Sequence, residues 1–236
     1  MEDLQAILDR LEQEHWWYQA RRTIVGTLLD DLQLHDTSSI ASIGCGNGTE
    51  LQFLQTKGHV TGLDIDLTVV AHCRAKGFEV IQADLLNNSL DEKFDVVIAM
   101  DIIEHIKDDQ KAIQALYKLV NSGGSLIITV PAFPFLWTEL DELTDFPHHR
   151  RYTRLTLKKL LKNPGMSVTL CSYYNFFLFP LVLLTKILKT SADKQLQLPY
   201  RFFNSLFYHI FATERFFLRW GNFPWGGSLI AVIKKD

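Results

Sequence analysis

The sequence predicts a doubly wound α/β fold, in which helices cover both faces of a mostly parallel sheet of seven strands. Short apolar runs alternate with helical stretches from residue 39 onward. These runs are almost continuously hydrophobic, which is typical of strands that are buried on both faces of a parallel sheet. A glycine-rich turn links the first run to the helix after it, as expected where a ligand approaches the first strand of such a sheet.

The expected elements follow one another in a regular order. Strands are expected over residues 39–44, 59–64, 78–84, 94–100 and 125–132, and helices over 49–58, 67–77 and 109–124. A sixth strand is expected over 166–174 and an antiparallel last strand over 227–235. Between these two strands lie two aromatic-rich segments of amphipathic pattern, so we expect a helical insertion there.

Length and cysteine usage limit the class of protein. The 236 residues suffice for one α/β domain, or two small ones, with a substantial core. The three cysteines, Cys45, Cys73 and Cys171, form no close pair in the sequence, which argues against a disulfide framework and indicates a reducing compartment. The opening MEDLQAILDR has no signal-peptide character, so a cytoplasmic location is expected. No histidine or cysteine cluster has metal-ligand spacing, and no metal is expected.

The net charge of −3 conceals an uneven distribution. Residues 1–145 contain 10 Lys/Arg and 24 Asp/Glu, whereas residues 146–236 contain 14 and 3. One explanation is that the C-terminal third faces an anionic partner. The other is that the two parts attract each other within one fold.

The glycine-rich turn reads IGCGNGTE, and acidic residues follow the next two strands. Gly44, Gly46 and Gly48 allow a sharp turn and a close approach of ligand to backbone. Asp64 ends the second expected strand and Asp84 the third. A dinucleotide-binding pattern requires a third glycine at position 49, where this chain has threonine. Acidic strand ends instead suit a cationic sulfonium ligand that carries ribose and adenine.

Five motifs together resemble a known family. IASIGCGNGTE, VTGLDID, VIQADLL, FDVVIAMDIIEHI and LVNSGGSLIITVP are similar, in order and spacing, to the motifs of class I S-adenosylmethionine-dependent methyltransferases (domain type 11/12). The resemblance covers about residues 38–132 and implies a Rossmann-like fold with S-adenosyl-L-methionine as cofactor. By resemblance, Gly44, Cys45 and Gly46 would pack against the methionine moiety, Asp64 would hold the ribose, Asp84 and Leu85 would frame the adenine, and Met100 and Asp101 would lie near the sulfonium. Gly48 and Ile65 complete the expected cofactor-binding residues.

Two further segments resemble a subgroup of this family, often associated with cell-surface glycan or lipid pathways. They are EHWWYQARR at residues 14–22 and HHRRYTRLTLKKLL at residues 148–161. Arg21 or Arg22 could meet the carboxylate of the cofactor as a bidentate partner. Alternatively, the two tryptophans of this segment only fasten the N-terminal helix to the domain.

Methyl transfer needs in-line positioning and, for a hydroxyl or amine acceptor, a base. The candidate bases are His105, His148 and His149, with Tyr152 as a residue that could orient one of them. His105 could instead serve only packing at the start of a helix. His148 and His149 could be ordinary surface residues beside two arginines.

The segment YYNFFLFPLVLLTKILK, residues 173–189, is too short in its apolar run to span a membrane. It could form a lid over the cofactor or an interfacial surface that attracts anionic lipid. Alternatively, it forms a dimer interface or additional core. The expected organisation is an N-terminal helical cap at 1–37, a cofactor-binding domain at 38–174 with 223–236, and a hydrophobic insertion at 175–222.

The leading functional hypothesis is a methyltransferase that acts on a small-molecule or lipid-linked acceptor, in the cytoplasm or at the inner face of the membrane. One alternative is an enzyme that cyclises or cleaves the same cofactor or transfers its aminocarboxypropyl group. Another is a non-catalytic protein that binds a membrane surface or a partner, and a homodimer is compatible with each. A nucleic-acid acceptor is disfavoured, because the basic third is rich in phenylalanine and leucine.

Overall fold

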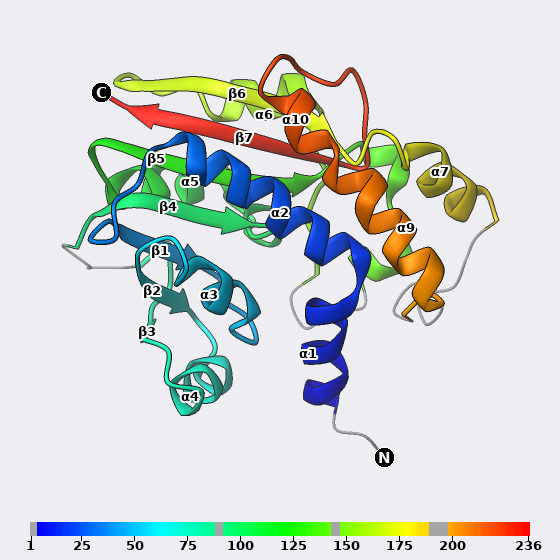
Figure 1. Cartoon of the computed structure of the whole chain (residues 1–236). Coiled ribbons are helices and arrows are strands. Elements are labelled where there is room, and N and C mark those ends of the chain that lie inside the picture. Colours follow the sequence, from blue (N-terminus) through cyan, green and yellow to red (C-terminus); the bar gives the residue numbers. More distant parts are fainter. Residues whose placement is uncertain (1–3, 88–91, 143–146, 189–197) are drawn as a thin grey trace.

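A computed structural model describes residues 4–87, 92–142, 147–188 and 198–236 of the chain (Figure 1). Seven strands form one sheet in the order β3-β2-β1-β4-β5-β7-β6. Their bounds are β1 Ser39–Ile43, β2 His59–Asp64, β3 Val80–Gln82, β4 Phe94–Met100, β5 Val120–Pro131, β6 Met166–Tyr174 and β7 Ser228–Lys235.

The sheet is parallel except at β7. Strands β1 to β5 pair in parallel, whereas β7 is antiparallel to both of its neighbours, β5 and β6. The strand order reverses between β1 and β4, and ligands of open α/β sheets bind outside the carboxyl ends of the strands at such a point. The predicted fold class is confirmed, including the antiparallel last strand and helices between the sixth and seventh strands.

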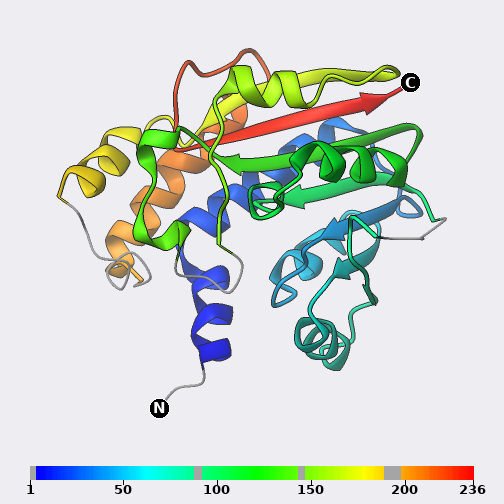
Figure 2. The same ribbon diagram turned by 180° about the vertical axis from the view of Figure 1, so that it is seen from behind.

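Helices cover both faces of the sheet. They are α1 Leu4–Glu14, α2 Trp16–Asp31, α3 Thr49–Leu54, α4 Leu67–Ala75, α5 Asp109–Leu119, α6 Arg154–Leu160, α7 Phe179–Ile187, α9 Arg201–Ala212 and α10 Glu214–Leu218. One buried cluster joins the sheet to α5 and α6, for example through Leu116 and Leu157. A second joins it to α2, α3, α4 and α9, for example through Ile24, Leu51 and Phe211. Figure 2 shows α5 and α6 in front of the sheet, with α2 and α9 behind it.

The boundary between α5 and β5 differs from the expectation. A helix over residues 109–124 is wrong, because α5 ends at Leu119 and β5 begins at Val120. Gly124 lies within β5, so close to β4 that a Cβ atom there would be 2.8 Å from the carbonyl oxygen of Asp95. Close backbone approach, and not the end of a helix, therefore requires this glycine.

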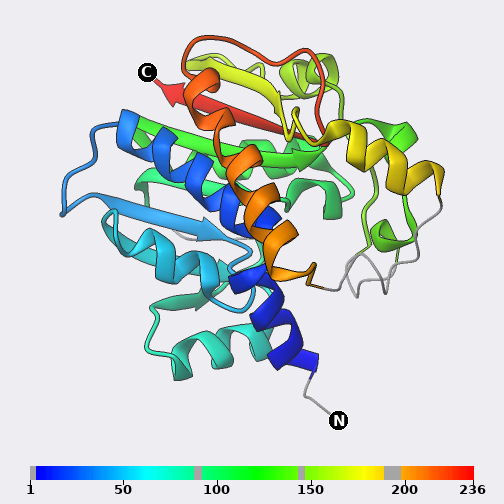
Figure 3. The ribbon, with the colours of Figure 1, turned by 45° about the vertical axis from the view of Figure 1, so that its right-hand side comes forward.

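The insertion between β6 and β7 packs partly on the N-terminal helices (Figure 3). The amide of Asn204, on α9, donates to the carbonyl of Glu14 at 2.7 Å and accepts from the backbone N–H of Trp16 at 2.9 Å. The Trp16 ring contacts Phe207 and Phe211 edge-on, with ring centres 5.7 and 5.9 Å apart. The C-terminal end of α9, with Phe211 and Ala212 buried, thus packs in the core.

Helix α7 also carries exposed apolar side chains. The exposed fraction of Ile187, at its end, is 75%. Within the described ranges, no helix is long and apolar enough to span a membrane. The middle of the insertion, residues 189–197, and residues 143–146 before the histidine pair lie outside the described residues.

Candidate functional site

A cavity of about 560 Å³ lies at the carboxyl ends of β1, β2 and β3. It is bounded by the glycine-rich turn, by the segments that follow β2 and β3, and by the residues just after β4. Seven residues predicted from the sequence line it together: Gly44, Gly46, Asp64, Ile65, Asp84, Leu85 and His105. The expectation of a site at this edge of the sheet therefore agrees with the position of the cavity.

The turn after β1 requires glycine at the cavity wall. Gly44 and Gly46 have φ values of 67° and 52°, in the left-handed region that favours glycine. At Gly44 a Cβ atom would lie only 2.1 Å from Cδ1 of Ile102, whereas at Gly46 the nearest atom would be 3.9 Å away. The backbone of Gly46 thus leaves room on the cavity side for a close-packed ligand.

The carboxylate of Asp64 is positioned by backbone donors. It accepts from the N–H of Gly46 at 3.3 Å and from the N–H of Asp66 at 3.0 Å. Burial raises the pKa of Asp64, and these N–H groups oppose that rise. A half-buried carboxylate of this kind can still accept hydrogen bonds from a ligand hydroxyl.

Asp84 faces the same cavity from the end of β3. Its oxygens accept from the N–H of Leu86 at 2.9 Å and from the side-chain amide of Asn87 at 2.7 Å. Leu85 and Ile106 add apolar walls beside it. This part of the cavity could receive a flat, mostly apolar ring with a polar edge.

Three predicted residues of the glycine turn and β4 lie outside the cavity wall. Cys45 is buried, and its thiol donates to Oδ2 of Asp64 at 4.0 Å. The neighbouring Cys73 and burial raise the pKa of the Cys45 thiol. Gly48 precedes α3 and faces Phe78, and Met100 belongs to the core. The structure therefore brings together two cysteines that are far apart in the sequence.

Arg21 is buried between two carboxylates. Its guanidinium donates to Glu50 at 2.8 Å and to Asp101, and it lies 4.7 Å from the centre of the Trp17 ring. Burial alone would lower the pKa of Arg21, but Glu50 and Asp101 outweigh it and raise the pKa. Arg22 donates instead to the carbonyl of Glu12 at 2.7 Å. Of the two arginines, Arg21 is thus the one joined to the end of β4.

Two of the three candidate histidines meet at the edge of the cavity. The ring of His105 lines the cavity and contacts His148 edge-on, with ring centres 4.5 Å apart. Nδ1 of His148 lies 2.6 Å from Oδ1 of Asp141. His149 is exposed, and its backbone N–H donates to the carbonyl of Glu104 at 2.8 Å.

The residue that orients His148 is Asp141, which the sequence analysis did not single out. Asp141 is 1% exposed and accepts a bidentate pair of bonds from Arg151 at 2.8 and 2.9 Å. It also accepts from the N–H of Thr138 at 2.7 Å. Tyr152, the predicted orienting residue, donates its hydroxyl to Asp109 at 3.0 Å. The one sequence pattern that could have drawn attention to Asp141 is the capping box Thr138-x-x-Asp141.

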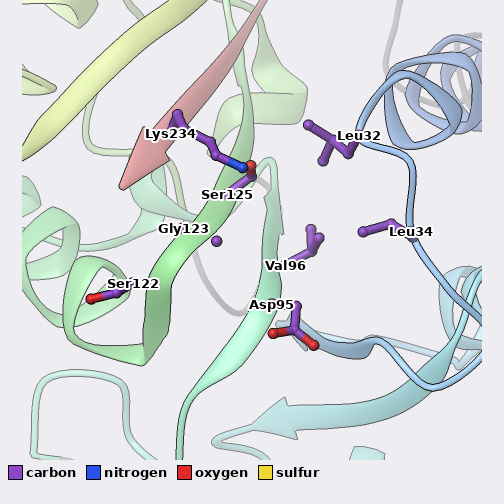
Figure 4. Close-up of a pocket in the computed structure, with 9 residues that line it drawn as sticks. Leu32, Leu34, Asp95, Val96, Ser122, Gly123, Ser125 and Lys234 are labelled. Atoms are coloured by element: carbon purple, nitrogen blue, oxygen red, sulfur yellow. The ribbon is translucent and has the colours of Figure 1, made fainter. Parts of the chain in front are cut away.

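A second, smaller cavity of about 150 Å³ lies at the opposite edge of the sheet (Figure 4). Its acidic residue, Asp95, accepts from the N–H and hydroxyl of Ser39 at 2.9 and 3.0 Å and from Asn121 at 2.9 Å. These bonds join β1, β4 and β5, so Asp95 is engaged in holding the strands. The larger cavity is the better candidate site.

Comparison with known proteins identifies the central part of the chain. Residues 41–128 match the family described as a methyltransferase domain. A ubiquinone biosynthesis O-methyltransferase of Pseudomonas putida is 30% identical over 99 residues, which are 38% of this chain and 43% of that protein. A tRNA (carboxymethyluridine(34)-5-O)-methyltransferase of Arabidopsis thaliana is 36% identical over 97 residues, 39% of this chain and 24% of that protein. The chain thus spans less than half the length of either relative.

Solved methyltransferase structures share the fold of this chain. The plantazolicin methyltransferase BamL, in complex with a triazolic desmethylPZN analogue and SAH, superposes with a TM-score of 0.62 at 16% identity. The superposition covers 97% of this chain and 89% of that one. Residues 41–128 are therefore similar to the methyltransferase-domain family, and the chain has the fold of solved methyltransferases.

Proposed function

We propose that the protein is an S-adenosylmethionine-dependent methyltransferase. The observation that carries the proposal is that Asp64 and Asp84 face one cavity together with the backbone of Gly44 and Gly46. A ligand with a ribose, an adenine and a positive charge matches two acceptor groups and a tight backbone turn. The family match of residues 41–128 supports the same cofactor.

The residues present fit that cofactor. Asp64 would hold the ribose hydroxyls, Asp84 and Leu85 would frame the adenine, and the open side of Gly46 would adjoin the methionine part. Arg21 pairs with Glu50 and with Asp101, which follows β4. The cofactor supplies an activated methyl group, and the chain would hold it in line with the acceptor and exclude water.

The acceptor would enter beside His105 and His148. Phe133 stacks on Tyr173 with ring centres 4.8 Å apart and lies 6.0 Å from Phe179 of the insertion. The ammonium of Lys186, on α7, donates to the carbonyl of Trp137. The insertion therefore contacts the segment that carries His148, which supports an apolar, aromatic wall and a small-molecule or lipid-linked acceptor.

A position at the inner face of the membrane is part of the proposal. Ile187 and Phe202 are 75% and 71% exposed and stand next to Lys186 and Arg201. Apolar side chains beside basic ones favour binding to an anionic bilayer surface. Co-sedimentation with anionic and with zwitterionic vesicles tests this, and equal or absent binding to both would contradict it.

The division of the chain into a cap at 1–37, a binding domain and an insertion at 175–222 is also part of the proposal.

The function is tested by label transfer. The protein is incubated with methyl-tritiated S-adenosylmethionine and an extract of its own cells, and the label is partitioned between organic solvent and water. Label in the organic phase supports a lipid or lipid-linked acceptor, and label in small water-soluble products supports a polar one. An Asp64→Ala variant should transfer much less label at the same cofactor concentration, whereas Asp30→Ala, which removes a surface pair with Lys57, should transfer as the wild type.

The same experiment without extract separates methyl transfer from other uses of the cofactor. A methyltransferase consumes no cofactor when its acceptor is absent. Breakdown or cyclisation of the cofactor under these conditions would contradict the proposal. Absence of label from every fraction, with the extract present, would also contradict it.

A further inference from the structure

Three potential metal ligands converge beside the cavity. One ligand atom from each of Glu104, His105 and His148 lies within 4.8 Å of the other two. Glu104 and His105 belong to the short helix Ile103–His105 that follows β4, and His148 comes from the segment before α6. The cluster is not evident in the sequence, because Glu104 and His105 precede α5 and β5 in the chain, whereas His148 follows them.

Glu104 is the unusual member of the group. Its side chain is 0% exposed, and neither carboxylate oxygen has a hydrogen-bond partner among the residues that the structure describes. A buried carboxylate without a partner is costly in free energy. The nearby arginines are already engaged, Arg21 with Glu50 and Asp101, and Arg151 with Asp141. Something else must therefore neutralise Glu104, either a proton or a cation.

His148 is held by Asp141 in an orientation that suits a metal ligand. Because its Nδ1 is bonded to Asp141, its Nε2 is the atom left to bind an ion or a proton. Metal-binding histidines typically bond their other ring nitrogen to a carboxylate, which fixes the tautomer and the orientation of the ring. Arg151 and Thr138 hold that carboxylate in turn.

We infer that Glu104, His105 and His148 bind a divalent transition-metal ion at the edge of the cavity. Two imidazoles and one carboxylate are the donor set of catalytic zinc sites and of non-haem iron sites, and imidazole disfavours magnesium or calcium. Ligand atoms about 2.0–2.2 Å from a tetrahedral zinc lie roughly 3.4 Å apart. The three side chains would therefore move together by a distance on the order of 1 Å on binding.

The metal site favours one class of methyl acceptor, an inference that rests on the proposed function. His105 also lines the cofactor cavity, so an open coordination position of the ion would adjoin the acceptor. A hydroxyl oxygen that binds the ion there loses its proton to solvent more readily. The oxygen then forms a bond to the methyl carbon as the sulfur–carbon bond breaks, and the neutral thioether leaves. A hydroxyl-bearing acceptor is therefore favoured over an amine, and the imidazoles act as ligands and not as bases.

The test uses cobalt(II) as a spectroscopic probe and zinc in calorimetry, both with the full chain. We expect one ion per protein, with the visible absorption of four-coordinate cobalt. Glu104→Gln and His148→Asn should weaken binding by at least about tenfold, and Asp141→Asn, which acts through His148, by about 10- to 100-fold. His59→Asn, an exposed histidine on β2, should bind as the wild type.

Binding of S-adenosylhomocysteine is measured on the same samples, which also checks that each variant is folded. If the wild type binds neither cobalt nor zinc, or if Glu104→Gln and His148→Asn bind them unchanged, the metal site is wrong and Glu104 carries a proton. If cobalt binds as expected but S-adenosylhomocysteine does not bind, the metal site stands and the proposed function fails. The two outcomes are thus distinguishable.

Discussion

Nδ1 of His148 lies 2.6 Å from Oδ1 of Asp141, and Arg151 holds both oxygens of that carboxylate. These residues lie in a connection between β5 and α6 that has little regular structure. The buried pair of Asp141 and Arg151 thus positions the His148 ring and leaves its other nitrogen at the edge of the cavity. The geometry of the site depends on this loop as much as on the sheet.

Replacing Asp141 by asparagine should destabilise the protein. Burial alone would raise the pKa of Asp141, but hydrogen bonds from His148 and Arg151 outweigh it and hold the pKa well below its usual range. Removing one partner of a buried pair costs about 3–5 kcal/mol. Because the folded-state pKa is depressed, this contribution is present above the unfolded pKa of about 3.9 and is lost as the pH falls below it.

Urea unfolding of the wild type and Asp141→Asn between pH 3 and pH 8 measures this difference. It should be constant above about pH 5 and should shrink towards pH 3. A difference that stays the same at the acidic end would show that Asp141 does not act through its charge.

Arg21→Met should lower the free energy of unfolding by about 3–5 kcal/mol, because it leaves Glu50 and Asp101 close together without their shared cation. Arg21→Lys should recover part of the loss, since lysine keeps the charge but cannot bond both carboxylates in the same planar geometry. Chemical denaturation measures both. A loss below about 1 kcal/mol for Arg21→Met would contradict a role of this pair in the fold.

The same variants show whether Arg21 also holds the cofactor carboxylate. If it does, Arg21→Lys should weaken S-adenosylhomocysteine, which carries the carboxylate, more than methylthioadenosine, which lacks it. Equal weakening of the two ligands would assign Arg21 to the fold alone.

Much of the sheet could be predicted from the sequence, because buried strands are apolar runs between polar or glycine-containing turns. The strand over 94–100 and the strand over 166–174 agree with β4 and β6 to the residue. The glycine turn and the acids Asp64 and Asp84 were also predictable, since each lies at or just after the end of a strand. The strand ends of a parallel sheet meet at one edge.

The rest of the site depends on contacts between residues whose pairing leaves no periodic pattern in the sequence. The Asp141–His148 pair and the approach of Glu104 to both histidines arise only in the folded chain. The Cys45–Cys73 contact likewise joins the glycine turn to α4. Such pairings are set by tertiary packing, which apolar periodicity does not encode.

Gly44→Ala should impair both stability and cofactor binding. Its φ of 67° strains an alanine, and the added methyl would lie 2.1 Å from Cδ1 of Ile102, so either this side chain, which lines the cavity, or the turn must shift. We expect a loss on the order of 1–3 kcal/mol in unfolding free energy and weaker binding of S-adenosylhomocysteine. Gly77→Ala is the matched control, because its φ is 87° but nothing lies within 4 Å of the added methyl. If both variants bind the ligand equally well, the turn does not shape the cavity.

Glu214→Gln should stabilise the protein at alkaline pH. Burial raises the pKa of Glu214 to about 7, although the N–H groups of Phe177 and Phe176 oppose the rise. The folded state therefore keeps a proton that the unfolded state loses above about pH 4.3, and stability falls as the pH rises from there to about 7.

The neutral glutamine cannot lose a proton, so its advantage should grow from near zero at pH 4.5 to on the order of 3 kcal/mol at pH 8. Urea unfolding at these two pH values checks it. An advantage independent of pH would show that Glu214 does not carry the proton in the folded state.

The most direct test of the central claim is calorimetric titration of the protein with S-adenosylhomocysteine. The wild type should bind one molecule, and Asp64→Ala, which removes the proposed acceptor of the ribose hydroxyls, should weaken binding by about ten- to a hundredfold. Asp30→Ala should bind as the wild type. If the wild type does not bind, or if Asp64→Ala binds with unchanged affinity, the cavity at the ends of β1, β2 and β3 is not a cofactor site of this kind.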